Sequence, residues 1–279
     1  MHIVCCIKQV PDTTQVKIDP ETNTLIRSGV ESICNPYDLV AVETAVRLVE
    51  KYGGKITVIS MGPPQTESAL RECLSLGVSE AILLSDRAFA GADTLATSYT
   101  LASAINQIGA AEPVDLIICG KQAIDGDTAQ TGPGIATRLG YNQFTYVSEI
   151  VGVDTTKNTI TVRREVEGGS QIIGGTLPAL LTVELELCPP RYATLPELVR
   201  ALRQEVKVWG ANELGAPPEM LGLKGSPTSV KQIFAPAPRK GGPVFDAKEN
   251  KEAIQNFLDT IFKNDTAILA EVLKNENKG

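Results

Sequence analysis

Histidine is almost absent from this sequence, and no two cysteines are spaced for metal binding. The single histidine is His2, and none of the six cysteines forms a Cys-x-x-Cys pair. We therefore expect no zinc or iron–sulfur site, and no Ser-His-Asp or Cys-His hydrolase. Most cysteines lie in apolar segments, the pattern of reduced, buried thiols in a cytosolic protein. A cytoplasmic location is expected.

Long hydrophobic runs and long basic runs are missing as well. No apolar run reaches the ~18 residues of a membrane-spanning helix. The first nine residues lack the hydrophobic region and cleavage site of a signal peptide, and they are expected to form a strand. The formal net charge is −7. These features disfavour a nucleic-acid partner and a membrane partner.

What the sequence does contain is an alternation of strands and helices in its first half. Nearly continuous apolar runs predict buried strands at residues 3–9, 55–61, 80–84 and 114–118. Amphipathic spacing predicts the intervening helices at residues 37–51, 66–76 and 95–108, and one more that ends near residue 140. This βαβ spacing predicts an α/β fold, a doubly wound, mostly parallel, Rossmann-like sheet with its ligand at the carboxyl ends of the strands.

The pattern changes after Gly140. Four segments read as antiparallel strands that extend the sheet edge, at residues 144–154, 159–166, 170–173 and 179–187. A polar excursion at residues 16–26 is predicted to be a surface hairpin, and residues 191–204 a short helix. These segments complete a nucleotide-binding domain expected over residues 1–205.

The last part of the chain differs in composition. Gly, Pro, Lys and Ser dominate residues 215–245, which is too long for an ordinary loop. We expect residues 206–279 to form an extended arm lying on another chain, with amphipathic helices at residues 247–263 and 266–273.

The stretch at residues 114–139 is the strongest candidate for a binding site. A buried strand leads into a loop that starts at Gly120, and the loop leads into a helix. Backbone N–H groups and the helix dipole favour a phosphate at such a junction. Thr128, Gln130 and Thr131 would add side-chain hydrogen bonds, and Asp125 and Asp127 would cap the helix or bind ribose hydroxyls. An ordinary polar turn explains the loop equally well, because it matches neither Gly-x-Gly-x-x-Gly nor the Walker A pattern.

Three other segments allow two interpretations. Asn35-Pro36-Tyr37-Asp38 could clamp an adenosine, although a helix start explains every residue. Thr94 and Thr97, behind Gly91-Ala92-Asp93, could face a ligand, although a simple helix cap is the default. Glu184 and Glu186 share a strand face and are expected at a solvated edge. An ATP-binding stress protein or nucleotide hydrolase would want a glycine-rich loop after the first strand, where Lys8-Gln9-Val10-Pro11-Asp12 stands instead.

These segments resemble the small (beta) subunit of electron transfer flavoprotein. Residues 120–125 with Gln130-Thr131-Gly132 look like its adenine-nucleotide loop, and residues 4–10, 35–38 and 43–48 match its N-terminal pattern. Residues 189–196, Pro-Pro-Arg-Tyr-Ala-Thr-Leu-Pro, look like its partner-recognition loop. The resemblance covers almost the whole chain, with three separated motifs in the family's order.

The resemblance implies a heterodimer with a larger alpha subunit that carries FAD on a mobile domain. The beta subunit holds either structural AMP or a second FAD. In the second, electron-bifurcating type, NADH reduces the beta FAD. One electron then passes to ferredoxin or flavodoxin, and the other passes through the alpha FAD to an acyl-CoA dehydrogenase. No side chain need be catalytic, because the flavin carries the redox chemistry.

The resemblance also distinguishes the two types. The AMP type has a bulkier loop after Ile-Asp and lacks the Gly-Ala-Asp-Thr stretch. Here Gly126, Thr128 and Ala129 are small and residues 91–94 are present, so we expect the FAD-binding, bifurcating type. The docking anchor would be Leu195, supported by Arg191 and Tyr192 in a partner-recognition loop at residues 189–203. Nucleotide contacts are expected from Cys6, Asn35, Asp38, Met61, Asp93, Thr94, Thr97, Gly120, Lys121, Gln122, Asp125, Gly126, Asp127, Thr128, Ala129, Gln130, Thr131 and Gly132.

Overall fold

The computed structural model describes residues 1–12, 17–18, 25–26, 31–229, 244–246 and 252–264. The chain divides into two compact units, residues 1–233 and residues 234–279. The boundary expected at residue 206 thus falls inside the first unit. The helix expected at residues 266–273 lies outside the described residues.

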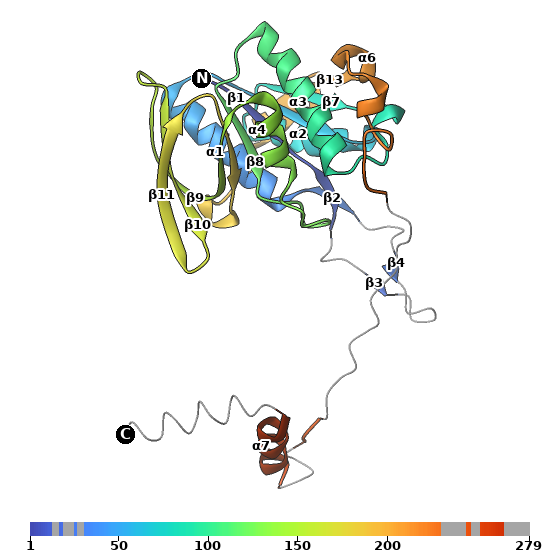
Figure 1. Ribbon diagram of the computed structural model, residues 1–279, viewed down its shortest axis with the longest axis vertical. Coiled ribbons are helices and arrows are strands. Elements are labelled where there is room, and N and C mark those ends of the chain that lie inside the picture. Colours follow the sequence, from blue (N-terminus) through green and yellow to red (C-terminus); the bar gives the residue numbers. More distant parts are fainter. Residues whose placement is uncertain (13–16, 19–24, 27–30, 230–243, 247–251, 265–279) are drawn as a thin grey trace. The chain divides into compact units, whose positions relative to one another are not determined.

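Within the described part of the chain, nine strands form one sheet (Figure 1). From one edge to the other they are β11 (Gly169–Thr176), β10 (Thr159–Val166), β9 (Asn142–Asp154), β12 (Ala179–Val183), β8 (Leu116–Gly120), β1 (His2–Cys6), β6 (Lys55–Met61), β7 (Glu80–Leu84) and β13 (Val206–Trp209). The strands from β9 to β13 pair in parallel, whereas β10 is antiparallel to both β9 and β11. The predicted mostly parallel sheet with an antiparallel extension is confirmed.

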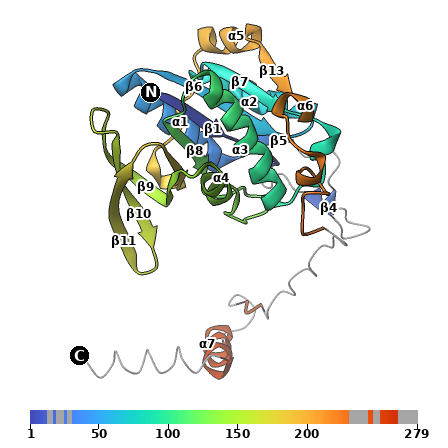
Figure 2. The ribbon, with the colours of Figure 1, turned by 45° about the horizontal axis from the view of Figure 1, so that its top comes forward.

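Helices cover both faces of this sheet (Figure 2). The hydrophobic core consists of two clusters, one on each face of the sheet, because successive side chains of a strand such as β1 point to opposite faces. Ile3 and Cys5 join the cluster under one set of helices, and Val4 and Cys6 join the other. The first set is α1 (Pro36–Tyr52), α2 (Glu67–Ser75) and α5 (Leu195–Arg203), and the second is α3 (Thr94–Ala111), α4 (Thr131–Leu139) and α6 (Ala211–Leu214). All six cysteines are free and buried, as expected.

One strand prediction was wrong. Residues 179–183 form β12, which is not antiparallel at the edge but lies inside the sheet, parallel to β8 and β9. Leu180 pairs with Ile117 on one side and with Gln143 on the other, and all five residues of β12 are buried. Burial on both faces is typical of a parallel strand. The expected strand ends early, because residues 185–187 form the 3-10 helix η4 (Leu185–Leu187).

Other short elements surround the sheet. The expected hairpin is present, since β3 (Lys17–Ile18) pairs antiparallel with β4 (Leu25–Ile26). Next to it in sequence, β2 (Gln9–Pro11) pairs with β5 (Ser32–Cys34). Three further 3-10 helices are η2 (Pro64–Thr66), η3 (Arg87–Phe89) and η5 (Pro218–Met220). No helix in the described ranges is long and apolar enough to cross a membrane.

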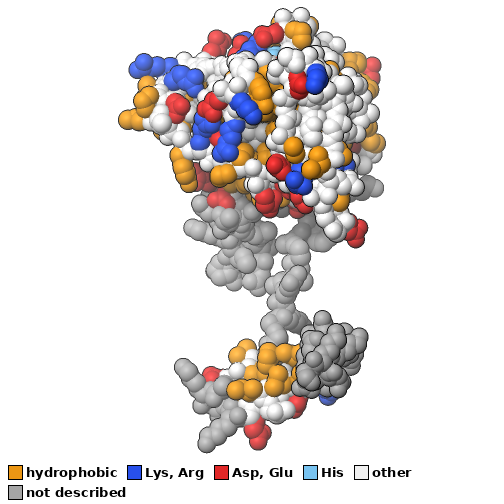
Figure 3. Space-filling model, turned by 90° about the vertical axis from the view of Figure 1, so that its left-hand side faces the viewer, with side chains coloured by type: hydrophobic (Ala, Val, Ile, Leu, Met, Phe, Trp, Pro, Cys, Tyr) orange, Lys and Arg blue, Asp and Glu red, His pale blue; other side chains and the backbone are white. Residues whose placement is uncertain are grey.

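Large hydrophobic side chains remain exposed on both units. Val151 and Ile172 of the antiparallel extension are 47% and 55% exposed. In the second unit, α7 (Ala253–Asn264) exposes Ile254 and Phe257. Figure 3 shows hydrophobic and basic side chains side by side on one face of the first unit, and a hydrophobic patch on the second. Such patches are typical of surfaces that contact another chain.

Candidate functional site

A cavity of about 650 Å³ lies at the carboxyl ends of β1, β6 and β8, beside the N-termini of α3 and α4. It is where the parallel topology places a ligand. Of the residues expected to contact a nucleotide, Asp125 alone does not line it. The others line it together: Cys6, Asn35, Asp38, Met61, Asp93, Thr94, Thr97, Gly120, Lys121, Gln122, Gly126, Asp127, Thr128, Ala129, Gln130, Thr131 and Gly132.

Asn35 holds the loop that follows β8. Its side-chain Nδ2 donates to the carbonyl oxygen of Gln122 at 2.9 Å, and its Oδ1 accepts from the N–H of Ile124 at 3.2 Å. Asn35 occupies the N-cap position of α1, yet its side chain makes no capping hydrogen bond. The helix-start interpretation therefore explains its position but not its side chain, which is 1% exposed and committed to the loop.

Asp38, on the cavity wall, connects the chain just after β1 to the end of β8. One carboxylate oxygen accepts from the N–H of Lys8 at 2.8 Å, and the other accepts from the N–H of Gly120 at 3.0 Å. Burial raises the pKa of Asp38 to about 7, although these backbone hydrogen bonds oppose the rise. A Cβ at Gly120 would come within 2.5 Å of Tyr37 Cβ. Glycine is required there by this close approach.

The middle of the loop has an unusual backbone. Asp127 and Ala129 have φ angles of 49° and 53°, the left-handed region that L-residues rarely adopt. The Asp127 carboxylate accepts from Gln122 Nε2 at 2.9 Å, and its N–H donates to the carbonyl oxygen of Ala123 at 2.9 Å. Both carboxylates of the loop are thereby engaged, because Asp125 pairs with Lys8 at 2.6 Å.

The N-terminus of α4 opens onto the cavity without a side-chain cap. Its N-cap residue is Gln130, so the first of the two roles expected of Asp125 and Asp127, capping this helix, was wrong, and binding of ribose hydroxyls stays a prediction. In the described part of the chain, the side chains of Thr128, Gln130 and Thr131 have no hydrogen-bond partner. Free helix N–H groups with hydroxyl and amide groups beside them are a suitable environment for a phosphate.

The N-terminus of α3, at the other side of the cavity, is already capped. Asp93 Oδ1 accepts from the N–H groups of Leu95 and Ala96 at 3.0 and 3.1 Å. Its Oδ2 accepts from the Thr228 hydroxyl at 2.9 Å, which places Thr228 on the cavity wall. These donors outweigh burial and hold the pKa of Asp93 below its usual value. The default prediction of a cap is confirmed, and Thr94 and Thr97 line the cavity beside it.

Lys121 has a partner that sequence reasoning missed. Its Nζ lies 2.9 and 3.0 Å from the two carboxylate oxygens of Glu184, and it sits over the rings of Tyr37 and Tyr146. Burial lowers the pKa of Lys121, but Glu184 outweighs it and the pKa rises. Glu184 is 7% exposed, so the expected solvated edge was wrong for it, although Glu186 is exposed. Only the parallel insertion of β12 beside β8 brings the two charges together.

Comparison with known proteins now decides the family. The model of the electron transfer flavoprotein domain matches residues 22–214. The chain belongs to the electron transfer flavoprotein family. Protein FixA of Azotobacter vinelandii is 56% identical over 240 residues, 86% of this chain and 85% of that protein. Electron transfer flavoprotein subunit beta of Clostridium acetobutylicum is 48% identical over 253 residues, 91% of this chain and 95% of that protein.

These similarities make the chain a beta-type subunit of the electron transfer flavoprotein family. Beta subunits of electron transfer flavoproteins pair with an alpha subunit and function in electron transfer, and the family is associated with flavin or nucleotide. The cavity residues fit such a group, because an uncapped helix N-terminus and unpaired hydroxyls face the space.

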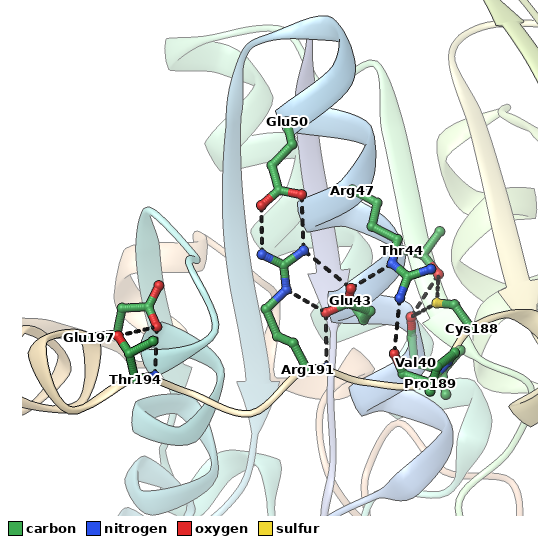
Figure 4. A network of polar contacts seen from close by, with 10 residues as sticks. All are labelled: Val40, Glu43, Thr44, Arg47, Glu50, Cys188, Pro189, Arg191, Thr194 and Glu197. Atoms are coloured by element: carbon green, nitrogen blue, oxygen red, sulfur yellow. Dashed lines mark hydrogen bonds and ion pairs between the residues drawn. The ribbon is translucent and has the colours of Figure 1, made fainter.

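The expected docking residues of this electron transfer flavoprotein subunit are not among those that line the cavity. Tyr192 is 97% exposed and Leu195 is 74% exposed, at the start of α5. Arg191 instead turns inward and pairs with Glu43 and Glu50 of α1 (Figure 4). The helix expected over residues 191–204 begins only at Leu195, where Thr194 and Glu197 form a capping box.

Proposed function

We propose that this chain is the beta subunit of a heterodimeric electron-bifurcating flavoprotein, and that its cavity holds FAD. When bound, FAD supplies hydride acceptance from NADH and single-electron transfer, one electron going towards ferredoxin or flavodoxin and the other through the alpha-subunit FAD to an acyl-CoA dehydrogenase. No side chain of this chain acts as acid, base or nucleophile in this proposal.

The extent of the cavity is the observation that supports the assignment of FAD. It runs from the loop after β8 to residues 92–97 at the start of α3, and includes Thr228. Its volume of about 650 Å³ lies well inside the ~300–1,000 Å³ range of cofactor sites. Gly126, Thr128 and Ala129 line it with small side chains. A pyrophosphate that continues past a first phosphate at α4 therefore has room.

The residues around the cavity have definable roles in this proposal. Free N–H groups at the start of α4 bind phosphate oxygens, and Thr128 and Thr131 donate hydroxyl hydrogen bonds. Asn35 and Asp38 do not need to touch the nucleotide, because they hold the loop and the strand ends in shape. Lys8 and Gln122 engage the carboxylates of Asp125 and Asp127, which lowers their repulsion of a phosphate.

A second candidate is a non-bifurcating subunit that holds structural AMP and supports the alpha subunit. The capping of α3 by Asp93 favours it, because that helix has fewer free N–H groups to offer a second phosphate. The uncapped N-terminus of α4 by itself matches a mononucleotide.

A flavin count separates the two candidates. The chain would be purified with its alpha subunit, and flavin absorbance and acid-released nucleotides would be measured per heterodimer. Two FAD molecules, with bleaching by NADH, are expected for the bifurcating subunit. One FAD plus one AMP would contradict it and favour the second candidate.

Docking of a redox partner is proposed for the segment that starts α5. Leu195 is an exposed apolar side chain on an ordered helix start, which suits an anchor that fills a pocket of the dehydrogenase. The alpha subunit is proposed to contact the second unit, where α7 exposes Ile254 and Phe257.

A further inference from the structure

We propose that Glu43 is the positioning residue of the docking segment, defined as residues 189–194, and sets how Tyr192 and Leu195 are presented to a partner protein. The inference rests on the docking role proposed for Leu195. It adds the residue that shapes the segment from inside the fold.

The carboxylate of Glu43 is 1% exposed and has two donors on each oxygen (Figure 4). Oε2 accepts from the N–H of Arg191 at 3.2 Å and from its Nε at 2.8 Å. Oε1 accepts from Arg47 Nε at 2.6 Å and from Arg191 Nη2 at 3.2 Å. One buried side chain therefore binds both the guanidinium and the main chain of Arg191.

The docking segment has little other support. Residues 189–194 form neither helix nor strand. Within the described part of the chain, the main chain of residues 190–193 makes a single hydrogen bond, the one from Arg191 to Glu43. At its start, the carbonyl oxygen of Pro189 accepts from Arg47 Nη2 at 3.2 Å, and Arg47 is itself bound to Glu43. At its end, the Glu197 carboxylate accepts hydrogen bonds from the N–H and the hydroxyl of Thr194, the N-cap residue of α5.

Glu43 is much more deeply buried than Glu50, the other acidic partner of Arg191. Glu50 contacts the same guanidinium at 2.6 and 3.0 Å, but its side chain is 57% exposed and water screens the pair. Burial acts to raise the pKa of Glu43, yet the hydrogen bonds from Arg191 and Arg47 hold it below its usual value. Glu43 thus remains a charged acceptor inside the fold, and its loss leaves two arginines without a shared partner.

The shape that Glu43 gives to the docking segment affects the free energy of binding a partner. A segment that is already in its bound shape loses less conformational freedom when a partner docks. Glu43 does not touch the partner in this proposal. Its replacement is therefore expected to weaken docking without slowing electron transfer inside a formed complex.

The test uses the full heterodimer with Glu43→Gln, and Glu50→Gln as the matched control on the same helix. Two quantities would be measured: the rate of trypsin cleavage after Arg191, by mass spectrometry, and KM and kcat with an acyl-CoA dehydrogenase. Glu43→Gln is expected to speed cleavage and to raise KM by about tenfold, with kcat unchanged. Glu50→Gln is expected to stay within about twofold of the parent.

A second variant guards against a folding defect in the first. Arg191→Lys keeps the charge and the trypsin site but loses the planar fork, and it is expected to shift both quantities in the same direction. Unchanged cleavage and KM in Glu43→Gln, an equal effect of Glu50→Gln, or a fall in kcat at constant KM would overturn the proposal. If the parent heterodimer transfers no electrons to the dehydrogenase, the proposed function fails. The cleavage comparison still decides whether Glu43 holds the segment.

Discussion

The side-chain amide of Asn35 donates a 2.9 Å hydrogen bond to the carbonyl oxygen of Gln122, 87 residues later in the chain. With the second bond, from the N–H of Ile124, it joins the start of α1 to the loop that lines the cavity. The shape of the loop therefore depends on a side chain that does not belong to it.

Replacing Asn35 is expected to weaken nucleotide binding. Asn35→Ala removes both bonds and leaves a partly buried carbonyl oxygen and a partly buried N–H unpaired, which costs up to about 1–3 kcal/mol for each group. Nucleotide affinity is expected to fall by at least about tenfold. Asn35→Asp keeps the acceptor for the N–H of Ile124 but loses the donor to the carbonyl oxygen of Gln122. Comparing the two variants therefore separates the contribution of the donor from that of the acceptor. Isothermal titration of nucleotide-depleted heterodimer measures both, and an unchanged affinity in Asn35→Ala would rule out this role.

Asp38 is expected to make stability fall as pH rises. The pKa of Asp38 is raised from 3.8 to about 7 in the folded chain, so folding takes up a proton between these values. Its contribution is fully present below about pH 4 and is lost as pH rises through about 7. Between pH 5 and pH 8 the free energy of unfolding is expected to lose about 2–3 kcal/mol from this group. Urea unfolding of the parent and of Asp38→Asn at both pH values measures it. A loss of equal size in Asp38→Asn would show that another group is responsible.

Gly120 and Gly126 lie in the same loop but differ in the space around them. An alanine Cβ at Gly120 meets Tyr37 and Asp38, whereas one at Gly126 has nothing within 4 Å. Gly120→Ala is expected to lower the free energy of unfolding by about 1–3 kcal/mol or more. Gly126→Ala is expected to change it by less than about 0.5 kcal/mol. Denaturant unfolding of both variants compares them, and equal losses would contradict the close approach at Gly120.

Leu195 is expected to contribute to docking of the dehydrogenase but not to flavin binding or stability. Leu195→Ala removes an exposed apolar anchor, so the KM for the acyl-CoA dehydrogenase is expected to rise by at least about tenfold. Flavin content and thermal stability are expected to match those of the parent, because the side chain is 74% exposed. Leu223→Ala, another exposed leucine at 62%, serves as the control. Stopped-flow electron transfer in both variants measures the effect, and no difference between them would remove the anchor role.

Much of the architecture was predictable from residue patterns. The strands at residues 55–61, 80–84 and 159–166 occur with the expected bounds, because apolar runs and alternation report burial locally. The loop after β8 was also found, since a strand, a glycine and a helix start are adjacent in the sequence. The family resemblance added the distant cavity residues, such as Cys6 and Met61, that no local pattern connects.

The amino-acid sequence by itself determined the elements, the loop and the chemistry available at the strand ends, because periodicity and turn residues act over a few neighbours. The tertiary structure alone decided that β12 enters the sheet beside β8, so that Glu184 meets Lys121, and that Glu43 meets Arg191. Each of these pairs joins residues more than sixty positions apart. A buried charge finds its partner through the packing of whole elements, and spacing along the chain carries no record of that packing.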